Sequence, residues 1–438
     1  MCDSFVVSGQ HSRDGTALFA KNSDRHAREP QAFVQFPAAF HPMGAQAHCT
    51  HISIPQVAET YGVMGHSPGW VWGLEHGVNE HAVAIGNHSV FSREPLEAEP
   101  GLIGMDLVRL GLERGRDARE ALEVIATLIE QHGQAGSARG PEGAGYHNAF
   151  LLADPEQAWQ METSGRRWGA RRVDLALQTN HLSMRSNWSI GSRDLESFAR
   201  LQGWWSGRER LDFAAAYRDP TVAGGLSEGR SDRGEHLLES SRGRHDVSTL
   251  IGVLQDHGVT AGVRNDAPPA RGHRNPSICM HAEAVGTTTA SLVAALPKDR
   301  SQPWPIWASF GSPCLGLFLP LYIDGCVPAS LASHENVVSP SGGPSAWAAF
   351  ADLRDAATEQ SINEIRAPFD ALSDQLEQER LLMEREVARL REAGKEAEAA
   401  LALSAFMSDA ADRAIATAVD QANRLRQLTH SEAFDRSR

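Results

Sequence analysis

The sequence begins MCDSFVV (residues 1–7), with a cysteine directly after the first methionine. Removal of Met1, which occurs readily before a small side chain, would leave Cys2 with both a thiol and a free α-amine. An α-amine titrates near pH ~7.7–8.0, so it can act as a general base at neutral pH. Nucleophile and base would then belong to one residue, a self-contained version of the pair used in covalent catalysis. The alternative is that a cysteine in second place has no special role.

A second polar cluster, KNSD, follows a predicted hairpin. Residues 4–9 and 16–21 are short apolar runs separated by a polar turn, which is a hairpin signal. Pairing of the two runs would bring Lys21 and Asp24 back toward Cys2. A cation beside a thiol lowers the thiol pKa, and a carboxylate can orient an α-amine. These two residues are therefore candidate site residues, although a solvated polar turn would explain the cluster equally well.

In the rest of the chain, the spacing of apolar residues predicts a mixture of strands and helices. Apolar residues recur at helical spacing between residues 104 and 132, with a break near Gly115. The polar, Gly/Arg-rich stretch 223–245 is expected to form a surface loop around a short helix. Further strands are expected at residues 47–54, 82–85, 148–153, 158–163, 287–296 and 304–310.

Several of these stretches together resemble a known family. Residues 1–6 and 21–25 closely resemble the secernins and, more broadly, the cysteine-type N-terminal-nucleophile dipeptidases and amidohydrolases, a superfamily that includes bile-salt hydrolase and penicillin V acylase. The similarity covers roughly residues 1–330 and, more loosely, the tail. It continues through residues 68–73, 79–81, 104–114, 146–148 and 212–217. The resemblance implies an α+β fold, a four-layer α-β-β-α sandwich with Cys2 on a central strand.

The resemblance also implies roles for the N-terminal candidates. Cys2 matches the nucleophile, and its own amine matches the base. Lys21 matches a position that is Arg in the bile-salt hydrolases; Lys keeps the charge but loses the planar, two-pronged guanidinium, so bidentate substrate contacts are not expected here. Asp24 resembles the carboxylate that holds the N-terminal amine.

Three later residues complete the implied site. Asn87 resembles the side chain that helps to bind the oxyanion, and Asn180 resembles the second Asn of the pocket. Arg230 resembles an arginine that tethers the site, in an alignment that crosses a Gly-rich stretch. Taken singly, each Asn could instead be a turn former or a strand-end cap.

Together these residues predict an amide hydrolase, either a dipeptidase or an acyl-amide amidohydrolase. The Cys2 thiolate would attack the carbonyl of a small amide or dipeptide substrate and form a thioester, with no cofactor. One alternative is a non-enzymatic, secernin-like interaction protein. A lower-ranked alternative is a serine hydrolase, because residues 65–69 match G-x-S-x-G around Ser67. That motif needs a strand before it and a helix after it, and the residues that follow are a poor helix start.

The composition limits which classes of partner and which cellular location fit this chain. The net charge of −14 argues against a nucleic-acid partner or an anionic membrane surface. The apolar run 306–323 is interrupted by Gly and Pro and fits two buried strands rather than a membrane span. Five cysteines without a CxxC pair, and no signal-like start, favour a reducing, cytoplasmic location. Cys279 and His281 lack partners at zinc spacing, so no metal is predicted.

The composition changes at residues 339–344, which predicts a domain boundary. We expect a hydrolase domain over residues 1–338 and a helical extension over residues 339–438. Leu376, Met383 and Leu390 recur every seven residues, and a second helical run follows Gly394, so the extension should form a helical hairpin. Its apolar stripe should dock on the body of the protein or on a second copy of the chain, which would make a homo-oligomer.

Overall fold

The computed structural model describes residues 1–140, 142–222, 224–258, 277–282, 286–333, 343–357 and 362–436. These residues form two compact units. The first comprises Met1–Lys21, Phe36–Leu250 and Ala294–Lys298, and the second comprises Asn22–Gln35, Ile251–Val293 and Asp299–Arg438. The boundary expected between residues 338 and 339 stays a prediction, and residues 339–342 of the expected linker lie outside the described residues.

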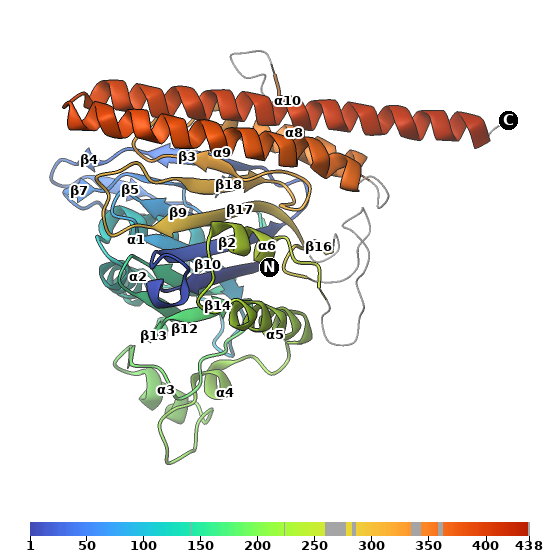
Figure 1. Cartoon of the computed structure of the whole chain (residues 1–438). Coiled ribbons are helices and arrows are strands. Elements are labelled where there is room, and N and C mark those ends of the chain that lie inside the picture. Colours follow the sequence, from blue (N-terminus) through green and yellow to red (C-terminus); the bar gives the residue numbers. More distant parts are fainter. Residues whose placement is uncertain are drawn as a thin grey trace. The chain divides into compact units, whose positions relative to one another are not determined.

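The first unit contains two antiparallel arrays of strands (Figure 1). In the smaller array the order is β14-β1-β2, with bounds Leu175–Gln178, Cys2–Val7 and Ala17–Arg25; β2 continues into the second unit. In the larger array the order is β15-β13-β12-β11-β10-β9-β8. Its bounds are β8 Val63–Pro68, β9 His76–Asn79, β10 Ala84–Val90, β11 His147–Ala153, β12 Ala158–Ser164, β13 Arg167–Val173 and β15 Ile190–Gly191.

Short elements complete the first unit. Two small ribbons are formed by β4 (Ala39–Phe40) with β7 (Glu59–Thr60) and by β5 (Gln46–His48) with β6 (Ser53–Pro55), and a 3-10 turn spans Gly9–His11. The helices are α1 Gly104–Arg114, α2 Ala118–His132, α3 Leu195–Leu201, α4 Phe213–Tyr217 and α5 Gly225–Ser240, and α6 (Val247–Leu254) leads into the second unit.

Helices α1 and α2 confirm the helical spacing and the break near Gly115. Their apolar faces lie against the larger sheet, α1 on β9 and β10 and α2 on β11 and β12. The second helix begins cleanly because the Asp117 side chain accepts hydrogen bonds from the backbone N–H groups of Arg119 and Glu120.

Strand β1 is buried along its whole length. It lies against β10 and β11 of the larger sheet, and its neighbour β14 is covered by α5. The strand does not alternate apolar and polar residues: Asp3 and Ser4 are buried in its first half, and Phe5, Val6 and Val7 form an apolar run in its second half. Cys2 is therefore placed inside the first unit.

The stretch expected to be mainly a loop is the helix α5. Its sequence is polar and contains several glycines, so helical periodicity was not visible in it. One of these glycines serves packing: a Cβ added at Gly234 would lie 3.0 Å from a ring carbon of Phe5 and 3.2 Å from Leu177. Close approach to β1 and β14 therefore stabilises a helix with weak intrinsic propensity.

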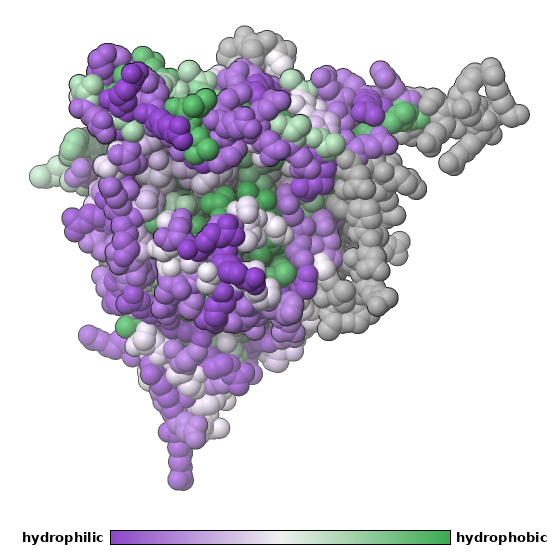
Figure 2. Space-filling model, viewed as in Figure 1, coloured by the Kyte–Doolittle hydropathy of each residue, from purple (hydrophilic) through white to green (hydrophobic). Residues whose placement is uncertain are grey.

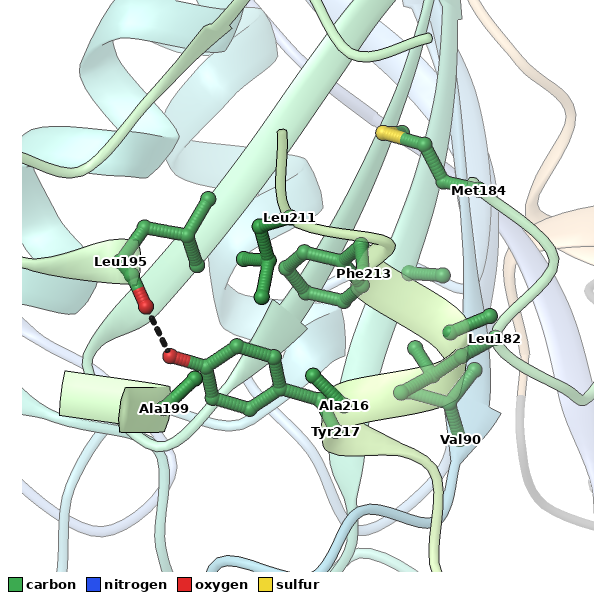
Figure 3. Packing of buried hydrophobic residues seen from close by; sticks show 11 residues of the cluster. Val90, Leu182, Met184, Leu195, Ala199, Leu211, Phe213, Ala216 and Tyr217 are labelled. Carbon is green, nitrogen blue, oxygen red and sulfur yellow. Dashed lines mark hydrogen bonds between the residues drawn. The ribbon is translucent and has the colours of Figure 1, made fainter. Parts of the chain in front are cut away.

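A hydrophobic cluster anchors the chain that follows the site residue Asn180. Figure 3 shows Leu182 and Met184 beside Phe213 and Tyr217 of α4. The two rings stack with centroids 5.0 Å apart, and the Tyr217 hydroxyl donates to the Leu195 carbonyl at 2.6 Å. This packing fixes the course of the backbone directly after Asn180.

The second unit contains further strands, of which β17 is the longest, and the long C-terminal helices. The strands are β3 Gln31–Phe36, β16 His281–Ala282, β17 Gly286–Leu296, β18 Ile306–Phe310 and β19 Leu319–Leu321; β16 pairs with β17, and β19 with β18. Strands β18 and β19 confirm that the apolar run 306–323 forms two buried strands. The helices are α7 Ala329–Ala332, α8 Ala346–Ala356, α9 Ile362–Glu392 and α10 Glu396–Arg436.

Helices α9 and α10 lie side by side (Figure 1). The chain reverses at Gly394, whose φ of +70° favours glycine. Across the pair, Arg413 of α10 contacts Glu379 of α9 at 2.6 Å. Among the described residues no helix is both long and apolar enough to cross a membrane, and the face seen in Figure 2 is largely hydrophilic.

Candidate active site

The register of β1 and β14 brings Asn180 to Cys2. Ser4 pairs with Gln178 in this antiparallel ladder, so Asn180, two residues further on, lies opposite Cys2. The backbone nitrogen of Cys2 donates to Asn180 Oδ1 at 2.8 Å. This nitrogen is an amide because Met1 is attached. It occupies the place that the α-amine would take after Met1 removal.

Arg230 fixes the orientation of the Asn180 amide. Its Nη2 donates to Asn180 Oδ1 at 2.8 Å, while Asn180 Nδ2 donates to the carbonyl of Ser89 at 3.0 Å. The oxygen of the amide must therefore face Cys2. Arg230 Nη1 also pairs with Asp3 at 2.7 Å, and neither side chain is exposed. Loss of one partner of such a buried pair typically costs about 3–5 kcal/mol, so this network holds the start of β1 firmly.

Lys21 lies near Cys2 but is shared with an acid, Glu75. Lys21 Nζ is 3.5 Å from Glu75 Oε2, and the Cys2 thiol donates to the same oxygen at 3.9 Å. All three side chains are buried. Glu75 therefore bridges the Cys2 thiol and the Lys21 ammonium, and its carboxylate offsets the charge of the cation.

Asn87 also contacts Glu75. The Asn87 amide lies between Glu75 and Asn148 Oδ1, 3.3 Å away; in the orientation that satisfies Glu75, Asn87 Nδ2 donates to Glu75 Oε2 at 3.2 Å and to the Glu75 carbonyl at 3.1 Å. Two donors, the Cys2 thiol and the Asn87 amide, and the Lys21 ammonium therefore lie around one carboxylate oxygen. The expected contribution of Asn87 to an oxyanion site stays a prediction.

Two glycines make room for these side chains. A Cβ at Gly86 would lie 2.4 Å from Lys21 Cδ and 2.9 Å from Ser4 Oγ. A Cβ at Gly104, the first residue of α1, would clash with Asn148 Oδ1 and with the side-chain amide of Asn87. Any other residue at these positions would displace the site, which explains the local sequence around Asn87.

Asp24 belongs to the second unit. It lies on β2, three residues after Lys21, and Thr288 Oγ1 donates to its Oδ1 at 2.7 Å. The expected contact of Asp24 with the amine of Cys2 stays a prediction.

Three histidines, His66, His76 and His88, are buried in the first unit. Nδ1 of His66 lies 2.9 Å from Nε2 of His76, and Nε2 of His88 lies 2.7 Å from Ser4 Oγ. Burial, and then the charge of Lys21, lowers the pKa of His66 to about 3 and those of His76 and His88 well below the ordinary value. These imidazoles are therefore neutral at pH 7.

Ser67 does not have the surroundings of a serine nucleophile. It lies within β8, and the next element is strand β9 rather than a helix. Its hydroxyl donates to the Gly73 carbonyl at 2.8 Å. The strand-to-helix turn that the G-x-S-x-G motif requires is absent from this segment, so the serine-hydrolase alternative is wrong in its structural premise.

The structure thus groups Cys2, Lys21, Asn87, Asn180 and Arg230 within one unit. Sequence reasoning missed Glu75, which lies just before β9, between two of the stretches that carry the family resemblance. No local pattern marks Glu75, because its contacts come from Cys2, Lys21 and Asn87 in three separate segments. Sequence reasoning also left Cys279 and His281 without partners, whereas the structure brings two further ligand-type side chains to them, as described below.

Comparison with known proteins identifies the class. The model of peptidase family C69 matches residues 1–222, and the chain belongs to this family. A probable dipeptidase from Salmonella dublin is 26% identical over 240 residues, which cover 49% of this chain and 53% of that protein. The chain therefore matches only about half the length of this curated relative.

Solved structures show weak similarity. A C2A mutant of conjugated bile acid hydrolase from Clostridium perfringens is 12% identical, with a TM-score of 0.40 over 71% of this chain and 89% of that one. Penicillin V acylase from Agrobacterium tumefaciens is also 12% identical, with a TM-score of 0.41 over 73% of this chain and 86% of that one.

The buried histidines predict a loss of stability in acid. Between about pH 6.5 and pH 3 the unfolded chain protonates His66 and the folded chain does not, so the free energy of unfolding must fall as the pH falls through this window. One such proton contributes up to about 1.4 kcal/mol per pH unit. In urea unfolding at pH 6 to 4, the variant His66→Gln should show a shallower slope by up to that amount. Substitution of the exposed His48 by Gln should leave the slope unchanged; an unchanged slope in His66→Gln would contradict the assignment.

Proposed function

We propose that the protein is an amide hydrolase, a dipeptidase or acyl-amide amidohydrolase, that uses Cys2 as an N-terminal nucleophile once Met1 has been removed. The observation that carries the proposal is the hydrogen bond from the Cys2 nitrogen to Asn180, held in orientation by Arg230. Membership of peptidase family C69 and the similarity to a probable dipeptidase support the reaction class.

The proposed reaction is an acyl transfer in two stages. The free α-amine of Cys2 takes the thiol proton, and the thiolate attacks the substrate carbonyl. The tetrahedral intermediate collapses to a thioester as the protonated amine gives its proton to the leaving amine. Water, deprotonated by the same amine, then hydrolyses the thioester and regenerates the thiol. The substrate's acyl and amine parts leave as acid and amine, and no redox step or cofactor is required.

Each neighbour has a distinct role in this proposal. Asn180 accepts a hydrogen bond from the amine, which leaves the amine's lone pair available for the thiol proton. Lys21 favours the thiolate. Asn87 turns one N–H from Glu75 to the substrate and, with a backbone N–H, stabilises the oxyanion; removing one such donor typically costs ~10²–10³ in rate. Glu75 is a positioning residue that holds Lys21 and Asn87 and limits the effect of the Lys21 charge on Cys2.

The proposal extends to the architecture. In the first unit α1 and α2 cover the larger sheet, β1 lies against the other face of that sheet, and α5 covers β14. This succession supports a four-layer α-β-β-α sandwich. We also propose that residues 339–438, with α9 and α10, form an extension whose apolar side docks on the body or on a second copy of the chain.

Cys2→Ala tests the nucleophile. Turnover of a panel of dipeptides and N-acyl amino acids should fall by on the order of 10⁴ or more, because no other group in the proposed site can form the thioester. Circular dichroism and Tm should remain those of the wild type. The matched control is Cys326→Ser, since Cys326 is exposed and outside the proposed site. Wild-type turnover in Cys2→Ala would refute the proposal, and a wild-type protein inert on the whole panel would favour the interaction-protein alternative.

Substitutions of Lys21 and Glu75 should shift the ionisation of Cys2 in opposite directions. Charges at 4–6 Å shift a pKa by on the order of one to three units. Lys21→Met should raise the pH at which Cys2 is half-maximally alkylated by iodoacetamide, and Glu75→Gln should lower it. Peptide mapping separates Cys2 from the exposed Cys326, whose alkylation serves as the internal reference. Shifts in the same direction, or none, would show that the two charges do not act on the thiol.

A further inference from the structure

Four side chains that no part of the proposed reaction uses meet in the second unit. They are His257, Cys279, His281 and Cys314, and their ligand atoms all lie within 4.8 Å of one another. Three of the four are buried, and His257 is half-buried. His257 lies just after α6, and Cys314 lies in the turn that follows β18. His281 is the first residue of β16, and Cys279 precedes it by two residues.

The contacts converge on one atom. Nε2 of His281 lies 3.3 Å from Nε2 of His257, 3.3 Å from Sγ of Cys279 and 3.4 Å from Sγ of Cys314. A ring nitrogen offers a single proton or a single lone pair, so it cannot satisfy three neighbours by hydrogen bonding. A cation shared by all four atoms explains the convergence better than a hydrogen-bonded cluster does.

The spacing fits a tetrahedral ion. Bond lengths of ~2.3 Å for Zn–S and ~2.0–2.1 Å for Zn–N place the ligand atoms of a tetrahedral site about 3.3–3.8 Å apart. The three distances to His281 fall within or at the edge of that range. Two thiolates with two imidazoles form a borderline-soft donor set that suits Zn²⁺, whereas Mg²⁺ and Ca²⁺ require oxygen ligands.

Hydrogen bonds hold the three ligand-bearing segments together without the ion. Asn22 Nδ2 donates to the carbonyls of Leu254 and Ile278 at 2.9 and 2.8 Å, and its Oδ1 accepts from Ser291 at 2.7 Å. This one amide therefore links the end of α6 to the residue before Cys279.

Two more bonds complete the framework. The backbone N–H of Cys279 donates to the Asp256 carbonyl at 3.0 Å, and Gln255 Nε2 donates to the Pro313 carbonyl, next to Cys314, at 2.9 Å. Each of the three ligand-bearing segments is thus tied directly to another of them. The site is pre-organised, as a metal centre of high affinity requires.

We propose that His257, Cys279, His281 and Cys314 bind one Zn²⁺ ion as a closed structural site that clamps these three segments. Binding forms two Zn–S and two Zn–N bonds, and the two thiol protons pass to solvent; the histidines bind as neutral imidazoles and no oxidant is needed. All four positions are supplied by protein, so no coordination place is left for substrate or water. This inference is independent of the proposed hydrolase reaction.

Metal analysis of the purified full-length protein tests the site. Wild type and the control Cys326→Ser should each carry about one zinc ion per chain, and Cys279→Ser and Cys314→Ser should lose at least nine-tenths of it. Removal of zinc from the wild type by a chelator should lower Tm by several degrees, and added Zn²⁺ should restore it. Zinc retained in both Cys variants, or no zinc bound by wild type even after Zn²⁺ is added, would overturn the proposal.

Cobalt replacement in the wild type gives a readout that needs no variant. Co²⁺ added to the zinc-depleted wild type should give the visible d–d bands of a tetrahedral ion and a near-ultraviolet thiolate-to-metal band. Cys314→His should retain the ion with a weaker thiolate band, because it exchanges one sulfur ligand for a nitrogen. An octahedral spectrum without the thiolate band would refute the assignment, as would recovery of Cys279 and Cys314 as a disulfide from protein kept under reducing conditions.

Discussion

The hydrogen bond between the Cys2 nitrogen and Asn180 is the constraint on which the proposed site depends. It joins the start of β1 to the residue just beyond β14, and the orientation of the Asn180 amide follows from the guanidinium of Arg230. Arg230 in turn is held by the buried carboxylate of Asp3. The N-terminus is thus fixed by a chain of charge-assisted contacts in a dry interior, where such contacts are strongest when every partner is present.

The second constraint is the shared oxygen of Glu75. This oxygen accepts hydrogen bonds from the Cys2 thiol and the Asn87 amide, and it forms an ion pair with the Lys21 ammonium. Burying Lys21 without a counter-ion would be very unfavourable, and Glu75 supplies that counter-ion. The arrangement allows a cation to lie next to the nucleophile inside the core, at the cost of part of its effect on the thiol. Neutral histidines close by add no further charge.

Much of this was visible in the sequence, for identifiable reasons. Strand β1, the α1–α2 pair and the strands β11 and β12 follow from local apolar patterns. Asn180 and Arg230 were found only through the family resemblance. Their roles depend on contacts with Cys2 and Asp3, which lie 178 and 227 residues earlier in the chain. Glu75 gave no local pattern, since its role depends on partners from three separate segments. Residues 223–245 were expected to be a surface loop around a short helix; the full length of α5 was not foreseen, because tertiary packing, through Gly234, outweighs its weak propensity.

The cluster in the second unit illustrates the same limit. Cys279 and His281 are two residues apart, but His257 precedes them by 22 residues and Cys314 follows by 33. No short spacing rule covers that pattern. Asn22, in the KNSD stretch, illustrates a related point. Its side chain links the segments that carry His257 and Cys279, a function that its neighbours Lys21 and Asp24 gave no reason to expect.

The most direct test of the central claim is the intact mass of the purified protein, measured before and after treatment with a thiol-directed electrophile, with the N-terminal peptide sequenced. The account predicts that Met1 is absent and that Cys2 is alkylated in preference to the buried Cys279 and Cys314. Retention of Met1 together with an unreactive Cys2 would contradict it, because the amine that serves as base would then not exist.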